Sequence, residues 1–248
     1  MPKTLLITGA SRGIGAASAI LAASQGWQVA VNYALNSLAA DGVVRQIRAS
    51  GGVAIAVQAD VSIEADVMRL FETVDAKLGR LDGLVNNAGV VDMAQRVDEM
   101  SIERLQRMWA TNITSGFVCA RCAVQRMSKL HGGSGGTIVN VSSVASRLGS
   151  PAQYVDYAAS KAAIDAFTLG LAKEVAAEGI RVNAVRPGII DTEIHASGGD
   201  PARVSRIASS LPMQRAGTAD EVAQAIVWLL SDASSYTTGT LLDVAGGR

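Results

Sequence analysis

A tyrosine and a lysine stand four residues apart at Tyr157 and Lys161, inside a stretch whose apolar pattern predicts a helix. Side chains at positions i and i+4 of an α-helix project from the same face, so these two groups are expected to lie close together. A free tyrosine has a pKa of about 10 and is a poor base at neutral pH. Because a neighbouring ammonium group favours the phenolate, we expect Lys161 to lower the pKa of Tyr157 toward the range of an acid–base catalyst.

A glycine-rich segment from Thr8 to Gly15 joins the first apolar run of the chain to the first helical pattern. Glycine allows a sharp turn and a close approach of the backbone to a pyrophosphate, which a side chain would block. The spacing is G-x-x-x-G-x-G rather than G-x-G-x-x-G, and a plain turn is the structural alternative. The position at a strand–helix junction favours a dinucleotide site, because the N–H groups of the helix would face the phosphates. The residues assigned to this site are Gly9, Ser11, Arg12, Gly13, Ile14 and Gly15.

The end of the second predicted strand indicates which dinucleotide would bind. A carboxylate about 20 residues after the glycine turn would bind the ribose 2′-hydroxyl of NAD. The sequence there is Val31-Asn32-Tyr33-Ala34, without an acid. Arg12 could pair with a 2′-phosphate, although it could instead only face solvent. We therefore expect NADP to be preferred over NAD, with Asn32 and Tyr33 as further cofactor contacts.

Short apolar runs alternate with longer helical patterns along the chain. Most runs are rich in Val, Ile and Leu without polar alternation, which is typical of parallel strands covered on both faces. The alternation predicts an α/β fold of the Rossmann-like, doubly wound type, with helices on both faces of a parallel sheet. The predicted strands are Thr4–Thr8, Gln28–Tyr33, Val53–Gln58, Gly83–Asn86, Gly136–Val141, Arg181–Arg186 and Thr240–Val244. The predicted helices lie near 14–25, 37–50, 63–79, 101–130, 155–178 and 218–231.

No linker or charge shift divides the sequence, so residues 1–248 are interpreted as a single domain for dinucleotide binding and catalysis. A segment without strong periodicity spans residues 188–212 and contains Ser197-Gly198-Gly199-Asp200-Pro201. Glycine hinges beside a short helical pattern predict a lid over the substrate, and a plain surface loop is the alternative.

The composition argues against several classes of function. The 22 Lys and Arg residues are balanced by 22 Asp and Glu without a basic run, which argues against nucleic-acid binding. No apolar stretch approaches the roughly 18 residues of a membrane-spanning helix. Residues 1–8 lead directly into strand-like sequence, without room for a signal peptide. Two cysteines do not make a disulfide framework, so a cytoplasmic location is expected.

Six further short motifs follow the glycine turn along the chain. In this order they resemble the short-chain dehydrogenase/reductase family, and the resemblance covers nearly the whole sequence. Each motif alone could arise by chance, but the joint set is highly specific. Two segments, 142–149 and 154–157, also resemble a bacterial branch of glucose-dehydrogenase-like and uncharacterised oxidoreductases. The motifs are Asp60-Val61, Asn86-Asn87-Ala88-Gly89, Asn112, Ser142-Ser143, Tyr157-Ala158-Ala159-Ser160-Lys161 and Pro187-Gly188.

The resemblance implies an oxidoreductase that transfers a hydride between a nicotinamide cofactor and a carbonyl compound or secondary alcohol. Tyr157 would act as general acid or base on the substrate oxygen, and Lys161 would also bind the nicotinamide ribose. Ser143 would hydrogen-bond that oxygen, with Ser142 as the alternative, because strand alternation lets only one of them meet Tyr157. The main chain of Asn112 would hold a water that connects Lys161 to solvent.

Two further features bear on this catalytic set. Tyr154 is a competing tyrosine, but it has no lysine four residues on, so it is interpreted as a wall of the substrate pocket. The separation of 14 residues between Ser143 and Tyr157 is one longer than the commoner family spacing. The intervening loop must absorb this extra residue.

By resemblance, the rest of the cofactor site comes from three other segments. The resemblance assigns Asp60 and Val61 to the adenine, Asn87, Ala88 and Gly89 to the sheet edge behind the nicotinamide, and Pro187, Gly188, Ile190 and Thr192 to the carboxamide side.

The resemblance also bears on assembly. Family members usually pair the two long helices, expected here near 101–130 and 155–178, which implies a homotetramer or homodimer. The alternative is that these helices present ordinary core faces.

A C-x-x-C spacing at Cys119 and Cys122 raises a redox or metal role. It falls inside a helical pattern, and zinc would need further ligands, whereas the chain has only His131 and His195. We therefore interpret the cysteines as small packing residues and expect no metal site. His195, in the predicted lid, is interpreted as a solvated polar residue.

The substrate is expected to be a small carbonyl compound or alcohol, and sugar oxidation, 3-oxoacyl reduction and small-ketone reduction remain open. Glu178, just before Gly179, places negative charge where a reductase of carrier-bound substrates would gain from a basic surface. This lowers the expectation for carrier proteins. The alternative function is a catalytically silent dinucleotide-binding sensor or partner module of the same fold. Against it stands the complete set Asn112, Ser143, Tyr157 and Lys161.

Overall fold

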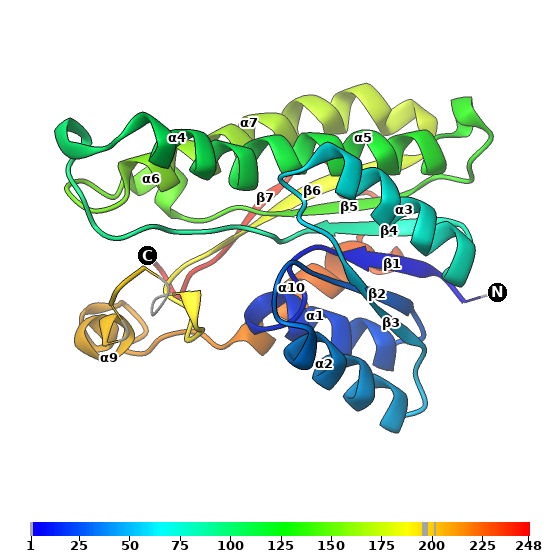
Figure 1. Cartoon of the computed structure of the whole chain (residues 1–248), viewed down its shortest axis with the longest axis horizontal. Helices are drawn as coiled ribbons and strands as arrows, with labels where there is room; N and C mark the ends of the chain where they lie inside the picture. The colour runs from blue at the N-terminus through cyan, green and yellow to red at the C-terminus, as the bar shows by residue number, and fades with distance from the viewer. Residues whose placement is uncertain (1, 195–197, 201) are drawn as a thin grey trace.

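The computed structural model describes residues 2–194, 198–200 and 202–248. Its centre is a seven-stranded sheet in the order β3-β2-β1-β4-β5-β6-β7, in which every neighbouring pair is parallel (Figure 1). This order confirms the predicted Rossmann-like, doubly wound α/β fold. The strands are β1 (Thr4–Ile7), β2 (Gln28–Tyr33), β3 (Ala54–Gln58), β4 (Leu81–Asn86), β5 (Gly136–Val141), β6 (Ile180–Pro187) and β7 (Leu241–Val244).

Two layers of helices cover the sheet (Figure 1). One layer contains α1 (Gly13–Ser24), α2 (Ser37–Ala49) and α10 (Ala219–Leu230). The other contains α3 (Glu64–Leu78), α4 (Ile102–Trp109), α5 (Ser115–Met127) and α7 (Val155–Val175). Two short helices, α6 (Ala145–Leu148) and α9 (Arg203–Ile207), lie on the side where the strands end (Figure 1).

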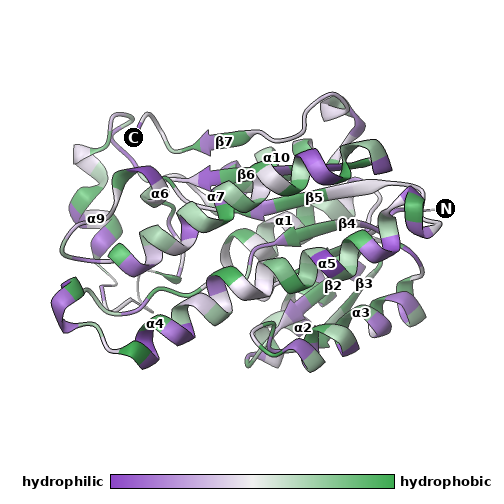
Figure 2. Ribbon diagram, turned by 90° about the horizontal axis from the view of Figure 1, so that it is seen from above, coloured by the Kyte–Doolittle hydropathy of each residue, from purple (hydrophilic) through white to green (hydrophobic). Residues whose placement is uncertain are grey.

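The strand residues alternate between the two helix layers. Leu5 and Ile7 of β1 belong to the hydrophobic cluster that includes α1, α2 and α10, whereas Leu6 belongs to the cluster that includes α3, α5 and α7. Because both faces are buried, the strands need apolar residues at every position, which explains their uninterrupted apolar runs. The strands are largely hydrophobic in Figure 2, while α2 and α3 alternate between hydrophobic and hydrophilic residues.

The structure divides the predicted helix 101–130. After α4, a π-helical turn spans Ala110–Thr114, and α5 then continues to Met127. A single π turn adds a residue without interrupting the apolar pattern, so periodicity alone does not reveal it. The predicted helix 155–178 likewise ends earlier, at Val175, and is followed by a 3-10 turn.

The predicted lid, residues 188–212, is described only in part. Its helical pattern corresponds to α9, on the side of the sheet where the strands end (Figure 1). His195, Ser197 and Pro201 lie outside the described residues. In the part of the chain that the structure describes, no helix is long and apolar enough to cross a membrane.

Candidate active site

A cavity lies where β4, β5 and β6 end, and it brings together residues from distant parts of the chain. Ile14 from the start of α1 lines one part of it, and Tyr157 and Lys161 of α7 line another. The carboxyl ends of parallel strands are the usual ligand site of doubly wound sheets. The other predicted site residues on its wall are Asn87, Gly89, Ser143, Pro187, Gly188, Ile190 and Thr192.

Tyr157 and Lys161 occupy successive turns of α7, as their spacing predicts. The Nζ atom of Lys161 lies 5.6 Å from the centroid of the Tyr157 ring. This ammonium group is buried and donates a hydrogen bond to the main-chain oxygen of Val141 at 2.8 Å. A β-carbon built on Gly89 would lie 3.4 Å from the same Nζ atom, so glycine leaves room for the lysine there.

The pKa of Tyr157 differs in direction from the sequence-based expectation. Burial raises the pKa of Tyr157, and a hydrogen bond from the Ser143 hydroxyl opposes this shift only in part. Burial also lowers the pKa of Lys161 to about 8, against the opposing effect of the Asp165 charge. Desolvation therefore outweighs the attraction that we expected between the ammonium and the phenolate. Tyr157 holds its proton at neutral pH, as a proton donor to a carbonyl oxygen must.

The two adjacent serines at the end of β5 have different partners. Ser142 donates a hydrogen bond to the main-chain oxygen of Lys161 at 3.1 Å. Ser143 accepts one from the main-chain N–H of Ala145 at 3.1 Å and bonds with the Tyr157 side chain. The structure thus places Ser143, rather than Ser142, beside the tyrosine hydroxyl.

The loop between Ser143 and Tyr157 is compacted by unusual backbone conformations. Its chain forms α6 and then passes through Gly149, Ser150 and Ala152 with φ values of 75°, 46° and 56°. Left-handed conformations are costly for residues other than glycine. This compact path lets the longer spacing still bring the serine to the tyrosine. Tyr154 lines the cavity next to this loop, in agreement with its interpretation as a pocket wall.

Asn112 lies in the π turn between α4 and α5, and its side chain is buried. Its Oδ1 atom accepts a hydrogen bond from the N–H of Val90 at 2.8 Å. Its Nδ2 atom donates to the Val90 oxygen at 2.9 Å and to the Ser160 hydroxyl at 3.2 Å. The side chain therefore joins the segment after β4 to α7, and only its main chain could take the predicted part in a water relay.

The glycine turn is fixed from inside the protein. Gly9 has a φ of 61°, and its N–H donates to the Asn32 side chain at 3.1 Å. A β-carbon on Gly15 would lie 2.6 Å from Nδ2 of Asn87 and 2.7 Å from the Gly9 oxygen, so a larger residue does not fit there. Gly15 thus serves close packing within the protein, while Ile14 in the first turn of α1 lines the cavity.

Two residues predicted as cofactor contacts have side chains that bind within the protein. The Asn32 side chain is buried, and its Nδ2 atom donates to the main-chain oxygens of Val57 and Ala59 at 3.3 and 3.0 Å. The Val61 side chain belongs to the hydrophobic core. Because both side chains are used internally, they support the site, and only their main chains could meet a ligand.

Thr8 is a supporting residue that sequence reasoning missed. Its hydroxyl accepts hydrogen bonds from the N–H groups of Asn87 and Ala88, both at 3.0 Å. The Asn87 side chain donates in return to the Thr8 and Gly9 oxygens, both at 2.9 Å. These bonds clamp the end of β4 to the glycine turn. The threonine directly before Gly9 is the signal that could have indicated it.

The segment after β6 faces the glycine turn. A β-carbon on Gly13 would lie 3.4 Å from Cγ2 of Thr192, which shows how closely the two segments approach. A β-carbon on Gly188 would lie 2.8 Å from the Cα atom of Ala245, so the chain after β7 holds this segment in place. Ile190 is buried beneath it.

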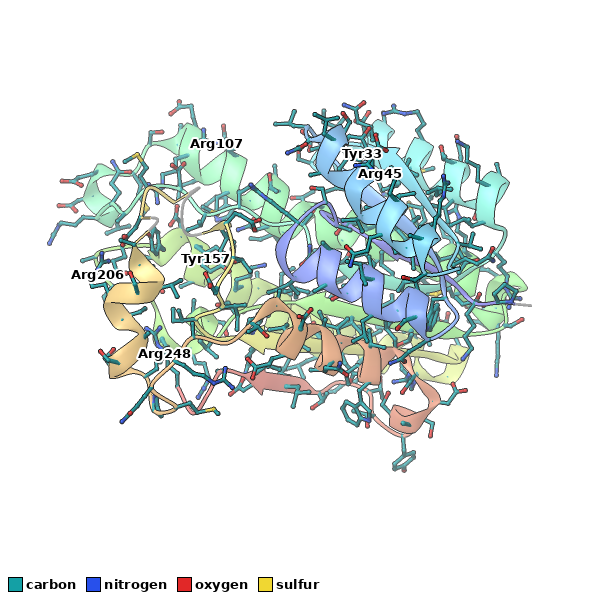
Figure 3. All side chains as sticks on the ribbon, turned by 90° about the horizontal axis from the view of Figure 1, so that it is seen from below. Tyr33, Arg45, Arg107, Tyr157, Arg206 and Arg248 are labelled. Carbon is teal, nitrogen blue, oxygen red and sulfur yellow. The ribbon has the colours of Figure 1, made fainter. Side chains whose placement is uncertain are left out.

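Two predicted cofactor contacts lie near the edge of the sheet that ends with β3. Tyr33 is the last residue of β2, and Asp60 follows the end of β3. Asp60 is exposed, and its Oδ1 atom accepts hydrogen bonds from the N–H and hydroxyl of Ser62 at 2.9 and 2.7 Å. Arg12, at the N-cap of α1, is also exposed. Figure 3 shows Tyr33 on the side of the molecule that carries α2.

A buried ion pair lies next to Tyr157 in the chain. The Nε atom of Arg104 in α4 lies 2.7 Å from Oδ2 of Asp156 in α7, and both side chains are almost inaccessible. The Oδ1 atom of Asp156 accepts a hydrogen bond from the N–H of Tyr157 at 2.9 Å. The pair therefore anchors the first turn of α7 at the residue next to the tyrosine.

Cys119 and Cys122 are buried in α5 and lie in the core, as packing residues do. Burial raises the pKa of the Cys119 thiol to about 12, so the reactive thiolate is suppressed. Among residues 2–194, 198–200 and 202–248, no three His, Cys, Asp or Glu side chains gather in a way that could hold a metal ion.

Comparison with known proteins places this site in a family. Residues 9–248 match the family described as "Enoyl-(Acyl carrier protein) reductase". The chain is 58% identical over 243 residues to the "Uncharacterized oxidoreductase YgfF" of Escherichia coli, covering 98% of each chain. It is 42% identical over 246 residues to a 3-oxoacyl-[acyl-carrier-protein] reductase of Synechocystis, covering 99% of this chain and 96% of that one. A glucose 1-dehydrogenase of Bacillus subtilis also matches, at 38% identity.

A solved structure gives the same result. The short-chain dehydrogenase of Burkholderia cenocepacia, crystallised in complex with NADP, superposes with a TM-score of 0.90 at 34% identity. The superposition covers 99% of this chain and 97% of that one. These matches confirm the resemblance found in the motifs. The chain therefore belongs to the short-chain dehydrogenase/reductase family of NAD(P)-dependent oxidoreductases.

Proposed function

We propose that this protein is an NADP-preferring enzyme that interconverts a carbonyl compound and a secondary alcohol, with Tyr157 as general acid and base. The observation that carries the proposal is the single cavity that Ile14 of the glycine turn shares with Tyr157, Lys161 and Ser143. This cavity therefore combines an acid–base group, a hydrogen-bond donor for the substrate oxygen and a segment that could bind a dinucleotide.

The residues around the glycine turn fit a dinucleotide. Gly9 and Gly13 have positive φ angles, and the turn leads into the N-terminus of α1, a helix of 12 residues. Such a terminus favours phosphate groups. When bound, the nicotinamide cofactor supplies or accepts the hydride. The residues proposed to hold it are Gly9, Ser11, Arg12, Gly13, Ile14, Gly15, Tyr33, Asp60, Asn87, Ala88, Gly89, Tyr157, Lys161, Pro187, Gly188, Ile190 and Thr192, with the main chains of Asn32 and Val61.

The protein side of the reaction follows from the geometry. Tyr157 would donate its hydroxyl proton to the carbonyl oxygen during reduction and take it back from the alcohol during oxidation. Ser143 would donate a hydrogen bond to the same oxygen, where negative charge develops. The Lys161 ammonium, fixed by the Val141 oxygen, would stabilise the phenolate that remains. The main chain of Asn112 would hold a water on the proton path from Lys161.

The preference for NADP rests on the end of β2. Residues 31–34 contain no carboxylate that would bind a free 2′-hydroxyl and repel a 2′-phosphate. Arg12 at the N-cap of α1 supplies a guanidinium group for that phosphate. NADP was the ligand in the Burkholderia complex, which is similar to this chain.

The function is tested by following cofactor absorbance with NADPH and NADH over sugars, 3-oxoacyl thioesters and small ketones. Turnover with a lower KM for NADPH than for NADH supports the proposal. Tighter binding of NADH would contradict the cofactor preference. Cofactor binding without turnover of any substrate would instead support a dinucleotide-binding sensor of the same fold.

Replacing Ser143 with alanine is expected to lower kcat by roughly 10²- to 10³-fold, the usual effect of removing one donor to a developing oxyanion. The matched control is Ser142→Ala. Ser142 bonds the main chain of Lys161, so its loss should cost far less. Steady-state rates of carbonyl reduction decide between them, and the opposite order of effects would reassign the role to Ser142.

We expect kcat/KM for carbonyl reduction to fall as the pH rises above about 8. The pKa of Lys161 is lowered to about 8, so its positive charge is present below this pH and lost above it. Burial raises the pKa of Tyr157, so the tyrosine keeps its proton over the same range. In Lys161→Arg the guanidinium stays charged, and the break near pH 8 should disappear. A break that survives in this variant would assign it to another group.

Carrier-bound substrates remain less favoured than small ones. Glu178 accepts a hydrogen bond from the Ser128 hydroxyl, so an acidic side chain lies just after the end of α7. Several relatives are named for acyl-carrier-protein substrates, whereas the Bacillus relative is named for glucose. The cavity walls decide among such substrates, and they differ from one member of a fold to another.

The proposal includes a homotetramer or homodimer and a cytoplasmic location. Phe117 of α5 and Leu169 of α7 are 47% and 40% exposed, and Phe117 stacks on Phe167 with 3.9 Å between ring centroids. Both helices lie on the outside of their layer, where a second copy could cover them (Figure 2).

The two free thiols of the chain suit a reducing compartment, which supports the proposed cytoplasmic location.

A further inference from the structure

We infer that the substrate carries a carboxylate, which Arg203 and Arg248 bind at the mouth of the catalytic cavity. The inference rests on the proposed function, because it assigns a ligand group to the same cavity. Both arginines line that cavity together with Tyr157. Arg203 begins α9 and Arg248 follows β7, so the two cations come from segments that are distant from each other and from α7 in sequence.

The two arginines lie at the same opening, since both line the cavity that holds Tyr157. Burial and the positive charge of Arg203 lower the pKa of Arg248. The same two arginines also line a second hollow, beside Ser210 and Pro212. Two like charges held at one opening repel each other, and an anion bound between them relieves that repulsion.

No acidic side chain neutralises this pair in the described part of the chain. Arg206, three residues along α9, forms an ion pair with Asp200. Among the described residues, no Asp or Glu side chain lies within ion-pair distance of Arg203 or Arg248. The positive charges of these two side chains thus have no acidic side-chain partner there, whereas that of Arg206 is paired with Asp200.

The Arg203 side chain is held by its neighbours. It donates a hydrogen bond to Oε1 of Gln153 at 2.9 Å. Its Cζ atom lies 5.3 Å from the centroid of the Tyr154 ring, within the range of a cation–π contact. Tyr154 is buried and lines the cavity, so the guanidinium is directed along the cavity wall.

Arg248 is positioned by a turn after β7. Gly246 and Gly247 have φ values of 61° and 88°, which bend the chain back toward α9. The main-chain oxygen of Arg248 accepts a hydrogen bond from Arg147 at 2.8 Å, and Arg147 also pairs with Asp243 at 2.9 Å. Figure 3 shows Tyr157 and Arg248 on the side of the molecule that carries α9.

The arrangement also limits the shape of the substrate. Tyr154 lies about one helical turn before Tyr157, so the Arg203 site is separated from the reacting carbonyl by the Tyr154 ring. Other walls of the cavity are apolar, at Val91, Leu148 and Ile194. The substrate class is an oxo acid in which an apolar segment separates the carbonyl from the carboxylate. A 2-oxo acid lacks this segment, because its carbonyl and carboxylate are adjacent.

The test compares 6-oxoheptanoate with its methyl ester, which has the same carbonyl but no charge, and uses pyruvate as the short acid. We expect wild-type kcat/KM to favour the acid over the ester by roughly 10- to 100-fold, mainly through KM. Arg203→Gln/Arg248→Gln should abolish this preference, so that kcat/KM for the acid falls by a larger factor than kcat/KM for the ester. Salt should raise the KM of the acid alone, because the site is partly open to solvent.

Two further variants separate charge from structure. Arg206→Gln removes a cation from the same short helix but not from the catalytic cavity, so the acid preference should persist. Arg203→Lys keeps the charge and should restore part of the preference that Arg203→Gln loses. Ester reduction without a preference for the acid, or a preference that survives in the double variant, would overturn the anion site while leaving the proposed reductase intact.

Calorimetry decides the anion site even if neither compound is reduced. The full-length protein saturated with NADP⁺ is titrated with 6-oxoheptanoate and, separately, with the ester. Binding of the acid alone, lost in the double variant, supports the anion site independently of turnover. Equal binding of acid and ester, or no binding of the acid, overturns it.

Discussion

Replacing Tyr157 with phenylalanine is expected to lower kcat for carbonyl reduction by roughly 10²- to 10⁴-fold, the usual contribution of a general acid. The variant removes the hydroxyl that carries the proton and keeps the ring that lines the cavity. Cofactor affinity should change little, because the glycine turn and its clamp by Thr8 are untouched. Single-turnover rates and equilibrium binding of NADPH measure the two quantities separately.

Tyr154→Phe is the matched control for this prediction. Tyr154 lines the same cavity and directly precedes the same helix, but no lysine follows four residues later. Its replacement should lower the rate by less than the range expected of a general acid. An undiminished rate in Tyr157→Phe, or a larger loss in Tyr154→Phe, would assign proton transfer to another group.

The fold could be predicted from the sequence because its strands are buried on both faces. Every strand of the structure overlaps a predicted run, and the boundaries differ by at most two residues. The helical pattern of 101–130 was misleading, because a π turn at 110–114 keeps apolar residues on one side. Only the backbone hydrogen bonds reveal this turn, which holds Asn112.

Within the site, local spacing predicted which residues would come together but not how each is used. The four-residue spacing of Tyr157 and Lys161 predicted that the two side chains lie close together, which the structure confirms. The helix predicted to follow the glycine turn begins at Gly13. The direction of the Tyr157 pKa shift was wrong, because burial depends on the whole fold rather than on the nearest charge. Arg203 and Arg248 carry no local pattern, and only the assembled cavity brings them together.

The internal roles of Asn32 and Val61 were missed for a similar reason. Both follow the strands where a cofactor contact is expected, and nothing in the local sequence shows which way their side chains point. In the structure, Asn32 bonds the main chain of β3 and of the glycine turn. A buried amide with several backbone partners is a structural group, since each bond lost would leave a polar atom unsatisfied.

Replacing Arg104 with methionine is expected to lower the free energy of unfolding by about 3–5 kcal/mol, because it leaves the buried Asp156 carboxylate without its partner. The Arg104 and Asp156 side chains are 7% and 0% exposed. Arg104 also donates to the Met93 oxygen at 2.7 Å and to the Gln95 side chain at 3.0 Å, so the segment after β4 would loosen too. Urea unfolding at fixed protein concentration measures the change.

Arg107→Met is the control on the same helix. Arg107 pairs with Asp92 at 2.6 Å, but its side chain is 62% exposed, and pairs of this kind contribute about 0–1 kcal/mol. A similar loss of stability in both variants would show that burial does not determine the loss of unfolding free energy. The comparison therefore separates the effect of burying an ion pair from the effect of having one.

The double variant Arg104→Met/Asp156→Leu separates the ion pair from packing. Because neither charge of this pair remains, stability should recover most of the loss, whereas the losses from two independent substitutions would add. Activity should not recover to the same extent, since Asp156 also accepts the hydrogen bond from the Tyr157 N–H and fixes the first turn of α7. A stable double variant with a low kcat would show that the pair is retained to position the tyrosine rather than to stabilise the fold. If both stability and kcat recovered fully, the ion pair would have no role in positioning Tyr157 and could be replaced by apolar residues.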